Sequence, residues 1–124
     1  MSHPGYHSFA ALSLAGACFS LLAGCRGSGQ NVLGAAPEGK PVTVAAAQAA
    51  VVKEPVTVRG KLVEKCPVAG CWFMVKDATG VMKVDTKAAG FVVLDVPLGV
   101  DITVSGKTAP NGSERMVEAT GVRY

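Results

Sequence analysis

The chain has 124 residues, of which 12 are basic and 9 are acidic, and 49% are hydrophobic. This length allows one small domain, and a net charge of +3 is too mild to indicate an acidic partner. Both histidines, His3 and His7, precede an apolar run at residues 9–23. If that run is cleaved off, the remaining protein has no histidine, which excludes Ser-His-Asp and Cys-His catalysis, histidine-ligated zinc and histidine-ligated haem.

The apolar run is too short for a membrane span and has the size of the apolar part of a secretory signal. It ends in Leu21-Leu22-Ala23-Gly24-Cys25, which resembles the lipobox of bacterial lipoproteins. The resemblance implies cleavage before Cys25, diacylglycerol on its sulfur, and acylation of the new amino terminus by a fatty acid such as palmitate. We therefore expect residues 1–24 to be a signal peptide and Cys25 to anchor the protein to a membrane, facing the periplasm. Arg26 in place of an aspartate implies the outer membrane, where the cell has one.

The next stretch, residues 25–41, holds the lipidated cysteine and a segment rich in glycine, without hydrophobic periodicity. This composition predicts a flexible tether that spans roughly 20–24 Å. The folded domain is expected over residues 42–124. At its start, Thr43 is expected to cap a short helix over residues 44–52, with a strand beginning near Pro41 as the alternative.

Five segments after Pro55 alternate apolar and polar residues and are separated by turn residues. They predict strands at 55–65, 71–77, 81–85, 101–107 and 114–123. Alternation fails over residues 86–99, where we expect a loop or short helix that plugs the core. Gly60, Gly106 and Gly121 indicate sharp coiling or close backbone approach. The fold class predicted is all-β: a five-stranded OB-fold-like barrel with a short N-terminal helix.

Two cysteines, Cys66 and Cys71, flank Pro67 and Gly70, which are residues that reverse a chain. A hairpin turn would bring the two thiols close, and an exported setting makes a disulfide their default state. Such a short loop gains about 2 kcal/mol from the bond on chain entropy. A catalytic thiol would need a low pKa, and although Lys65 adjoins Cys66, a hairpin turn offers no helix dipole.

Soft-metal binding is a further alternative for this motif. Cys66, Cys71 and Met74 carry thiolate and thioether groups of the kind that select Cu(I), and Met82 is nearby in sequence. Met82 is expected to point inward and Met74 outward, which favours two ordinary methionines and a disulfide. We therefore expect no metal and no cofactor, with redox or Cu(I) handling as the alternative function.

A candidate ligand surface lies on the outer face of the first three predicted strands, which OB-folds use for binding. The residues expected there are basic, aromatic or thioether side chains: Arg59, Lys61, Trp72, Met74, Lys76 and Lys83. Such a face would hold an oligonucleotide or oligosaccharide by charge and stacking, although the exported compartment argues against nucleic acid. The alternatives are a solvated sheet face for the lysines and a lid on the barrel end for Trp72.

The order of helix, Val56 to Leu62, Asp77-x-x-Gly80 and Gly99 to Gly106 resembles the bacterial OB-fold proteins of the envelope. Within that group, Cys66-Pro67-x-x-Gly70-Cys71-Trp72-Phe73 is similar to a motif of small exported proteins of unassigned role. The resemblance implies a fold and a compartment, but no activity. We expect a monomeric, membrane-anchored lipoprotein that is not an enzyme and binds or scaffolds an envelope protein or small ligand.

Overall fold

The structure is a computed structural model, and it describes residues 31–124. The predicted signal peptide and the lipidation site Cys25 lie outside these residues. The described part contains one short helix and six strands: β1 (Val32–Gly34), α1 (Val44–Ala49), β2 (Pro55–Lys65), β3 (Trp72–Asp77), β4 (Gly80–Asp85), β5 (Asp101–Asn111) and β6 (Glu114–Arg123).

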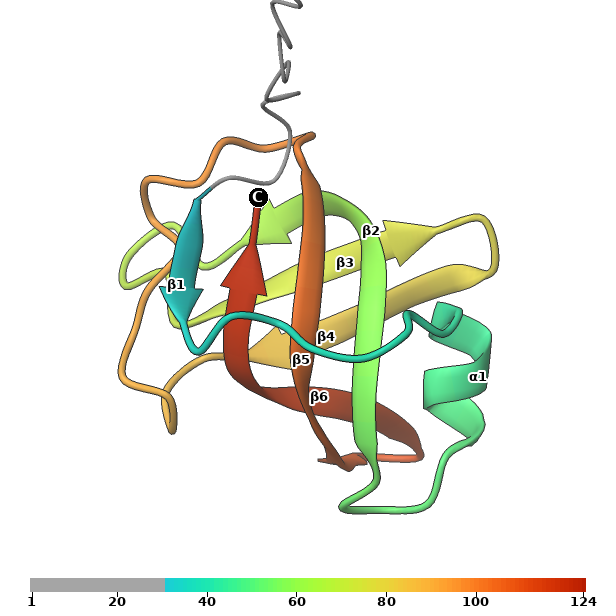
Figure 1. Ribbon diagram of the computed structural model, residues 1–124. Helices are drawn as coiled ribbons and strands as arrows, with labels where there is room; N and C mark the ends of the chain where they lie inside the picture. The colour runs from blue at the N-terminus through green and yellow to red at the C-terminus, as the bar shows by residue number, and fades with distance from the viewer. Residues whose placement is uncertain (1–30) are drawn as a thin grey trace, which may run out of the picture.

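Five of the strands close into a barrel, with β1 added beside β6 (Figure 1). Around the barrel the order is β2, β3, β4, β6 and β5, and β5 pairs again with β2. Only the β4–β6 pairing is parallel among these strands, and it joins Val84 to Val117. The predicted all-β OB-type barrel is confirmed. All five predicted strands are present, two with the predicted ends and three with one end shifted by one to four residues.

Strand β2 is long because it serves two neighbours. Its first half pairs with β5, and its second half pairs with β3 from Lys61 onward. Gly60 lies where the strand changes partner, and a Cβ there would overlap the carbonyl oxygen of Lys76. The predicted close approach at Gly60 is therefore confirmed, since only glycine leaves room for the adjacent β3 backbone.

The barrel interior is filled by the apolar residues of the alternating pattern. Two residues of the irregular loop 86–99, Val93 and Val96, are also buried, so this loop plugs the core as predicted. The loop and the β2–β3 turn lie together at the side of the barrel away from α1 (Figure 1). The buried strand residues include Val58, Leu62, Phe73, Val75, Met82, Val84, Ile102, Val104, Val117 and Val122.

Helix α1 is shorter than the predicted span of residues 44–52. Thr43 caps it as expected, because its hydroxyl accepts the N–H of Ala46 at 3.1 Å. The prediction was wrong at the other end: Ala50 is already extended, and Val51 is 68% exposed. The chain turns early because the N–H of Lys53 bonds to the carbonyl of Thr108 at 2.8 Å.

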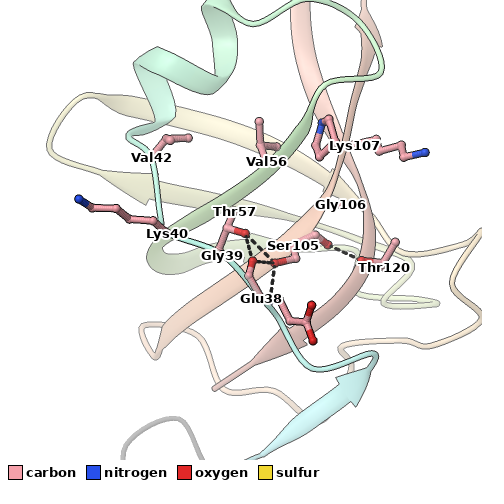
Figure 2. Close-up of a pocket in the computed structure, with 11 residues that line it drawn as sticks. Glu38, Gly39, Lys40, Val42, Val56, Thr57, Ser105, Gly106, Lys107 and Thr120 are labelled. Atoms are coloured by element: carbon pink, nitrogen blue, oxygen red, sulfur yellow. Dashed lines mark hydrogen bonds between the residues drawn. The ribbon is translucent and has the colours of Figure 1, made fainter.

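The described part of the predicted flexible linker is packed against the barrel, which corrects the boundary at residue 42. Strand β1 pairs antiparallel with β6, and Asn31 and Tyr124 exchange two backbone hydrogen bonds of 2.9 Å. Further along, the carbonyl of Glu38 accepts the hydroxyls of Thr57 and Ser105 (Figure 2). The composition of residues 31–41 did not predict that they pack on the barrel. They are held there by pairing with the edge of β6 and by hydrogen bonds from the hydroxyls of Thr57 and Ser105.

Candidate functional site

The six residues predicted for the ligand surface all point away from the core. Along β3, Phe73 and Val75 are fully buried, whereas Trp72 and Met74 are partly exposed and Lys76 is exposed. We use the name β2–β4 face for the outer side chains of these strands: Arg59, Lys61, Trp72, Met74, Lys76 and Lys83.

Cross-strand register sets two lysines against each other on this face. Lys61 of β2 lies directly opposite Lys76 of β3, an arrangement in which like charges destabilise a sheet. Lys61 is partly neutralised by Asp101, whose carboxylate lies 3.1 Å from its ammonium. Among residues 31–124, Lys76 has no ion-pair partner. The face therefore keeps an uncompensated positive charge beside Lys61.

A shallow cavity of about 490 Å³ lies at these two lysines. Its surface is mainly carbon, and three of its lining residues are charged. The lining residues are Gly60, Lys61, Val63, Lys76, Asp77 and Ala78. The arrangement suits a ligand that has an apolar or ring-shaped part and carries negative charge.

Trp72 lies at the other end of the face. The ammonium of Lys83 is 5.6 Å from the centre of its ring, within the range of a cation–π contact. Lys83 lies opposite Met74, and Arg59 lies opposite Thr103 of β5. Lys83 and Trp72 are therefore in contact with each other, and Arg59 adds positive charge on the side of the face next to β5.

The β2–β3 turn brings Cys66 and Cys71 together, as the sequence predicted. In the structure both are free, partly buried thiols, so the predicted disulfide is not formed here. The Cys71 side chain hydrogen-bonds to the sulfur of Cys66. The N–H of Gly70 donates to the carbonyl of Cys66 at 3.1 Å, which shapes the turn as a single helix-like turn.

This conformation changes the chemistry expected of Cys66. The N–H of Ala69, followed by that of Val68, lowers the pKa of the thiol to about 7 against the opposing effect of burial. Gly70 N–H and the Cys71 thiol add to the same effect. The sequence argument considered a helix dipole and Lys65 and did not include the turn's own N–H groups, because residue types do not reveal where those groups point.

The loop 86–99 holds the turn in place. The N–H of Val93 donates to the carbonyl of Gly70 at 2.8 Å. Lys65, expected to assist Cys66 as a neighbouring cation, instead donates to the carbonyls of Leu94 at 2.7 Å and Val96 at 2.5 Å. The backbone of the turn, rather than Lys65, is therefore the main influence on the Cys66 thiol.

The two methionines considered as soft-metal ligands lie on opposite sides of the sheet. Met82 is buried in the core, whereas Met74 lies on the outer face opposite Glu64. Within residues 31–124, no three His, Cys, Asp or Glu side chains gather in a group that could hold a metal ion. Met82 therefore points inward and Met74 outward, as the sequence predicted.

A groove of about 420 Å³ was not foreseen (Figure 2). It lies between the segment around Gly39 and strands β2 and β5. The hydroxyls of Thr57 and Ser105 lie 2.8 Å apart and both bond to Glu38. These hydroxyls satisfy one another, and the charged side chains that line the groove, Glu38, Lys40 and Lys107, are of both signs.

Comparisons with known proteins bear on the fold. Residues 27–123 match the family described as "Bacterial OB fold (BOF) protein". Among solved structures, the hypothetical protein ygiW from E. coli is similar, with 21% identity, a TM-score of 0.54, and coverage of 72% of this chain and 95% of that one. No curated protein matches. In the described part of the chain, no helix has the length and hydropathy needed to cross a membrane.

Proposed function

Because the chain belongs to the family of bacterial OB-fold proteins, we propose that it is a membrane-anchored envelope lipoprotein whose barrel is a non-catalytic binding module. The lipobox-like sequence before Cys25 supports the anchor and the removal of residues 1–24. Arg26 supports an outer-membrane destination, and the domain acts as a monomer. The disulfide between Cys66 and Cys71 belongs to this proposal as the state that the pair reaches in an oxidising compartment.

The β2–β4 face is the proposed ligand surface. The observation that supports it most is the Lys61–Lys76 pair beside the cavity. A sheet gains nothing from two lysines directly opposite each other, whereas an anionic group placed between them would remove the repulsion. None of the six residues of the face is a histidine, serine, cysteine or carboxylate. The face therefore offers cationic and aromatic groups of the kind that bind a ligand.

The ligand class that fits best is an extended oligosaccharide that carries carboxylates. The carbon-lined cavity accepts a ring, Trp72 offers an aromatic surface, and the lysines meet negative charge. OB barrels bind both oligosaccharides and oligonucleotides on this face. The exported compartment favours the carbohydrate.

The first test is titration of the full chain with an oligomer of galacturonate at low salt, with Trp72 fluorescence as the readout. Trp72 is the only tryptophan, so the signal reports from the face itself. We expect saturable binding that weakens as salt is raised. Lys76→Glu should weaken it by about tenfold or more, which corresponds to about 1.4 kcal/mol.

Lys53→Glu is the matched control, because it makes the same charge change at an exposed lysine between α1 and β2, outside the face and outside the groove of Figure 2. Its affinity should stay within about twofold of wild type. An equal loss in both variants would show a general charge effect and contradict a specific face. Tighter binding of a deoxythymidine oligomer, with a steep salt dependence, would replace the carbohydrate by nucleic acid.

A further inference from the structure

The cysteine turn has a geometry that a purely structural disulfide does not explain. The turn is already closed by backbone hydrogen bonds, since the N–H of Cys66 donates to the carbonyl of Trp72 at 3.1 Å and Gly70 N–H donates back to Cys66 at 3.1 Å. The loop 86–99 adds the bond from Val93 to Gly70. A disulfide would therefore brace a hairpin that is held shut without it.

The hydrogen-bond donors around Cys66 favour one redox state. Its sulfur accepts from the backbone N–H groups of Ala69, Val68 and Gly70 and from the Cys71 thiol. Hydrogen bonds to an ionised acceptor are stronger than those to a neutral one, so this arrangement stabilises the thiolate. A disulfide sulfur carries no charge and gains much less from the same donors. The turn thus stabilises the reduced pair, which makes its disulfide easier to reduce.

The turn is also open to a reaction partner. Val68, at its tip, is 85% exposed, and both cysteines are only partly buried. Because Trp72 follows Cys71 directly, the pair lies at one end of the β2–β4 face. A disulfide carried by another molecule can approach Cys66 from solvent without movement of the barrel core.

We propose that Cys66 and Cys71 are a redox-active pair that exchanges with disulfide bonds of other molecules. The Cys66 thiolate attacks one sulfur of a substrate disulfide, RS–SR, which forms a mixed disulfide and releases RS⁻. Cys71 then loses its proton to water and attacks the Cys66 sulfur, which forms the Cys66–Cys71 disulfide and releases the second RS⁻. Two electrons pass from the pair to the substrate, and a substrate dithiol reverses both steps.

The size of the expected rate effect follows from the thiolate fraction. A thiol with a pKa of about 7 is about half ionised at pH 7, compared with about 3% for an ordinary thiol of pKa about 8.5. The nucleophilicity of a thiolate falls as its pKa falls, and this reduces the roughly 16-fold gain in thiolate by about fivefold. Cys66 should therefore react about threefold faster at pH 7 than an unperturbed cysteine.

The experiment uses the full chain with Cys18→Ser and Cys25→Ser, in which Cys66 and Cys71 are the remaining two of four cysteines. The pH profile of Cys66 alkylation by iodoacetamide is read by mass spectrometry, in the folded protein and in the same protein unfolded in urea. We expect a midpoint near pH 7 when folded and near about 8.5 when unfolded. Coincident midpoints would overturn the proposal, and this comparison needs no variant of the turn.

The second arm uses glutathione disulfide as the probe. The intact pair should release two equivalents of glutathione per chain and change the Trp72 fluorescence as the internal disulfide forms. Cys71→Ser should stop at a mixed disulfide on Cys66, and Cys66→Ser should react several-fold more slowly. Equal rates of mixed-disulfide formation in the two single variants would contradict the assigned roles. Lys53→Glu, at an exposed position outside both the turn and the binding face, should leave the exchange rate unchanged. Exchange is measured without the galacturonate oligomer and binding without glutathione disulfide, so that the two proposals fail separately.

Discussion

A single carboxylate, Asp77, ties the start of helix α1 to the turn between β3 and β4. One of its oxygens accepts the N–H of Val44 at 2.8 Å, and the other accepts the N–H and hydroxyl of Thr79 and the N–H of Gly80. Burial alone would raise the pKa of Asp77. The hydrogen bonds, led by that of the Thr79 hydroxyl, outweigh burial and hold the pKa below its usual value.

This lowered pKa predicts an acid-dependent contribution to stability. A carboxyl whose folded pKa is lowered stabilises the protein above its unfolded pKa of about 3.9, and the contribution is lost as pH falls through the folded pKa. Asp77→Asn keeps one oxygen acceptor instead of two and should destabilise the barrel by about 1 kcal/mol at pH 7. Urea unfolding at several pH values checks this. The wild type and the variant should converge in acid, and a constant difference down to pH about 2 would contradict the role of the charge.

At the scale of elements, the turn 66–71 depends on a neighbouring loop. Gly70 has a φ of +61°, and a Cβ there would lie 2.7 Å from both the backbone nitrogen and the Cγ of Leu94. The sequence predicted the turn from Pro67 and Gly70, and it predicted the closeness of the thiols. It did not predict the N–H groups around Cys66, because their direction is set by contact with the loop 86–99.

Gly70→Ala should therefore affect both stability and thiol chemistry. Gly112→Ala is a matched control, because Gly112 has a φ of +62° and a Cβ added there would have no other atom within 4 Å. The control should lose about 1–2 kcal/mol from the left-handed backbone alone. Gly70→Ala should lose about 1–3 kcal/mol more from the overlap with Leu94. Its Cys66 alkylation midpoint should rise from near 7 toward about 8.5, whereas the control keeps the wild-type midpoint. Equal unfolding free energies and midpoints in the two variants would show that the contact does not shape the turn.

At the scale of the whole molecule, the barrel was predictable because its strands alternate and its turns carry glycine, proline and aspartate. The outward-facing side chains of the β2–β4 face were predicted from the same alternation. The Lys61–Lys76 pair and the cavity depend on register between strands, and a bulge between Leu62 and Glu64 shifts that register. The ordered segment 31–41 depends on a partner at the far end of the chain. Strand register and the pairing of distant segments are both tertiary features, so no local sequence pattern predicts them.

We propose that a ligand meets this barrel on the β2–β4 face. The direct test is to follow backbone amide chemical shifts of the full chain during titration with the galacturonate oligomer at low salt. We expect the largest changes at Lys61, Trp72 and Lys76. Changes centred on Thr57 and Ser105 would place the ligand in the groove of Figure 2 instead. Those changes, or the absence of any change at low salt, would contradict the claim.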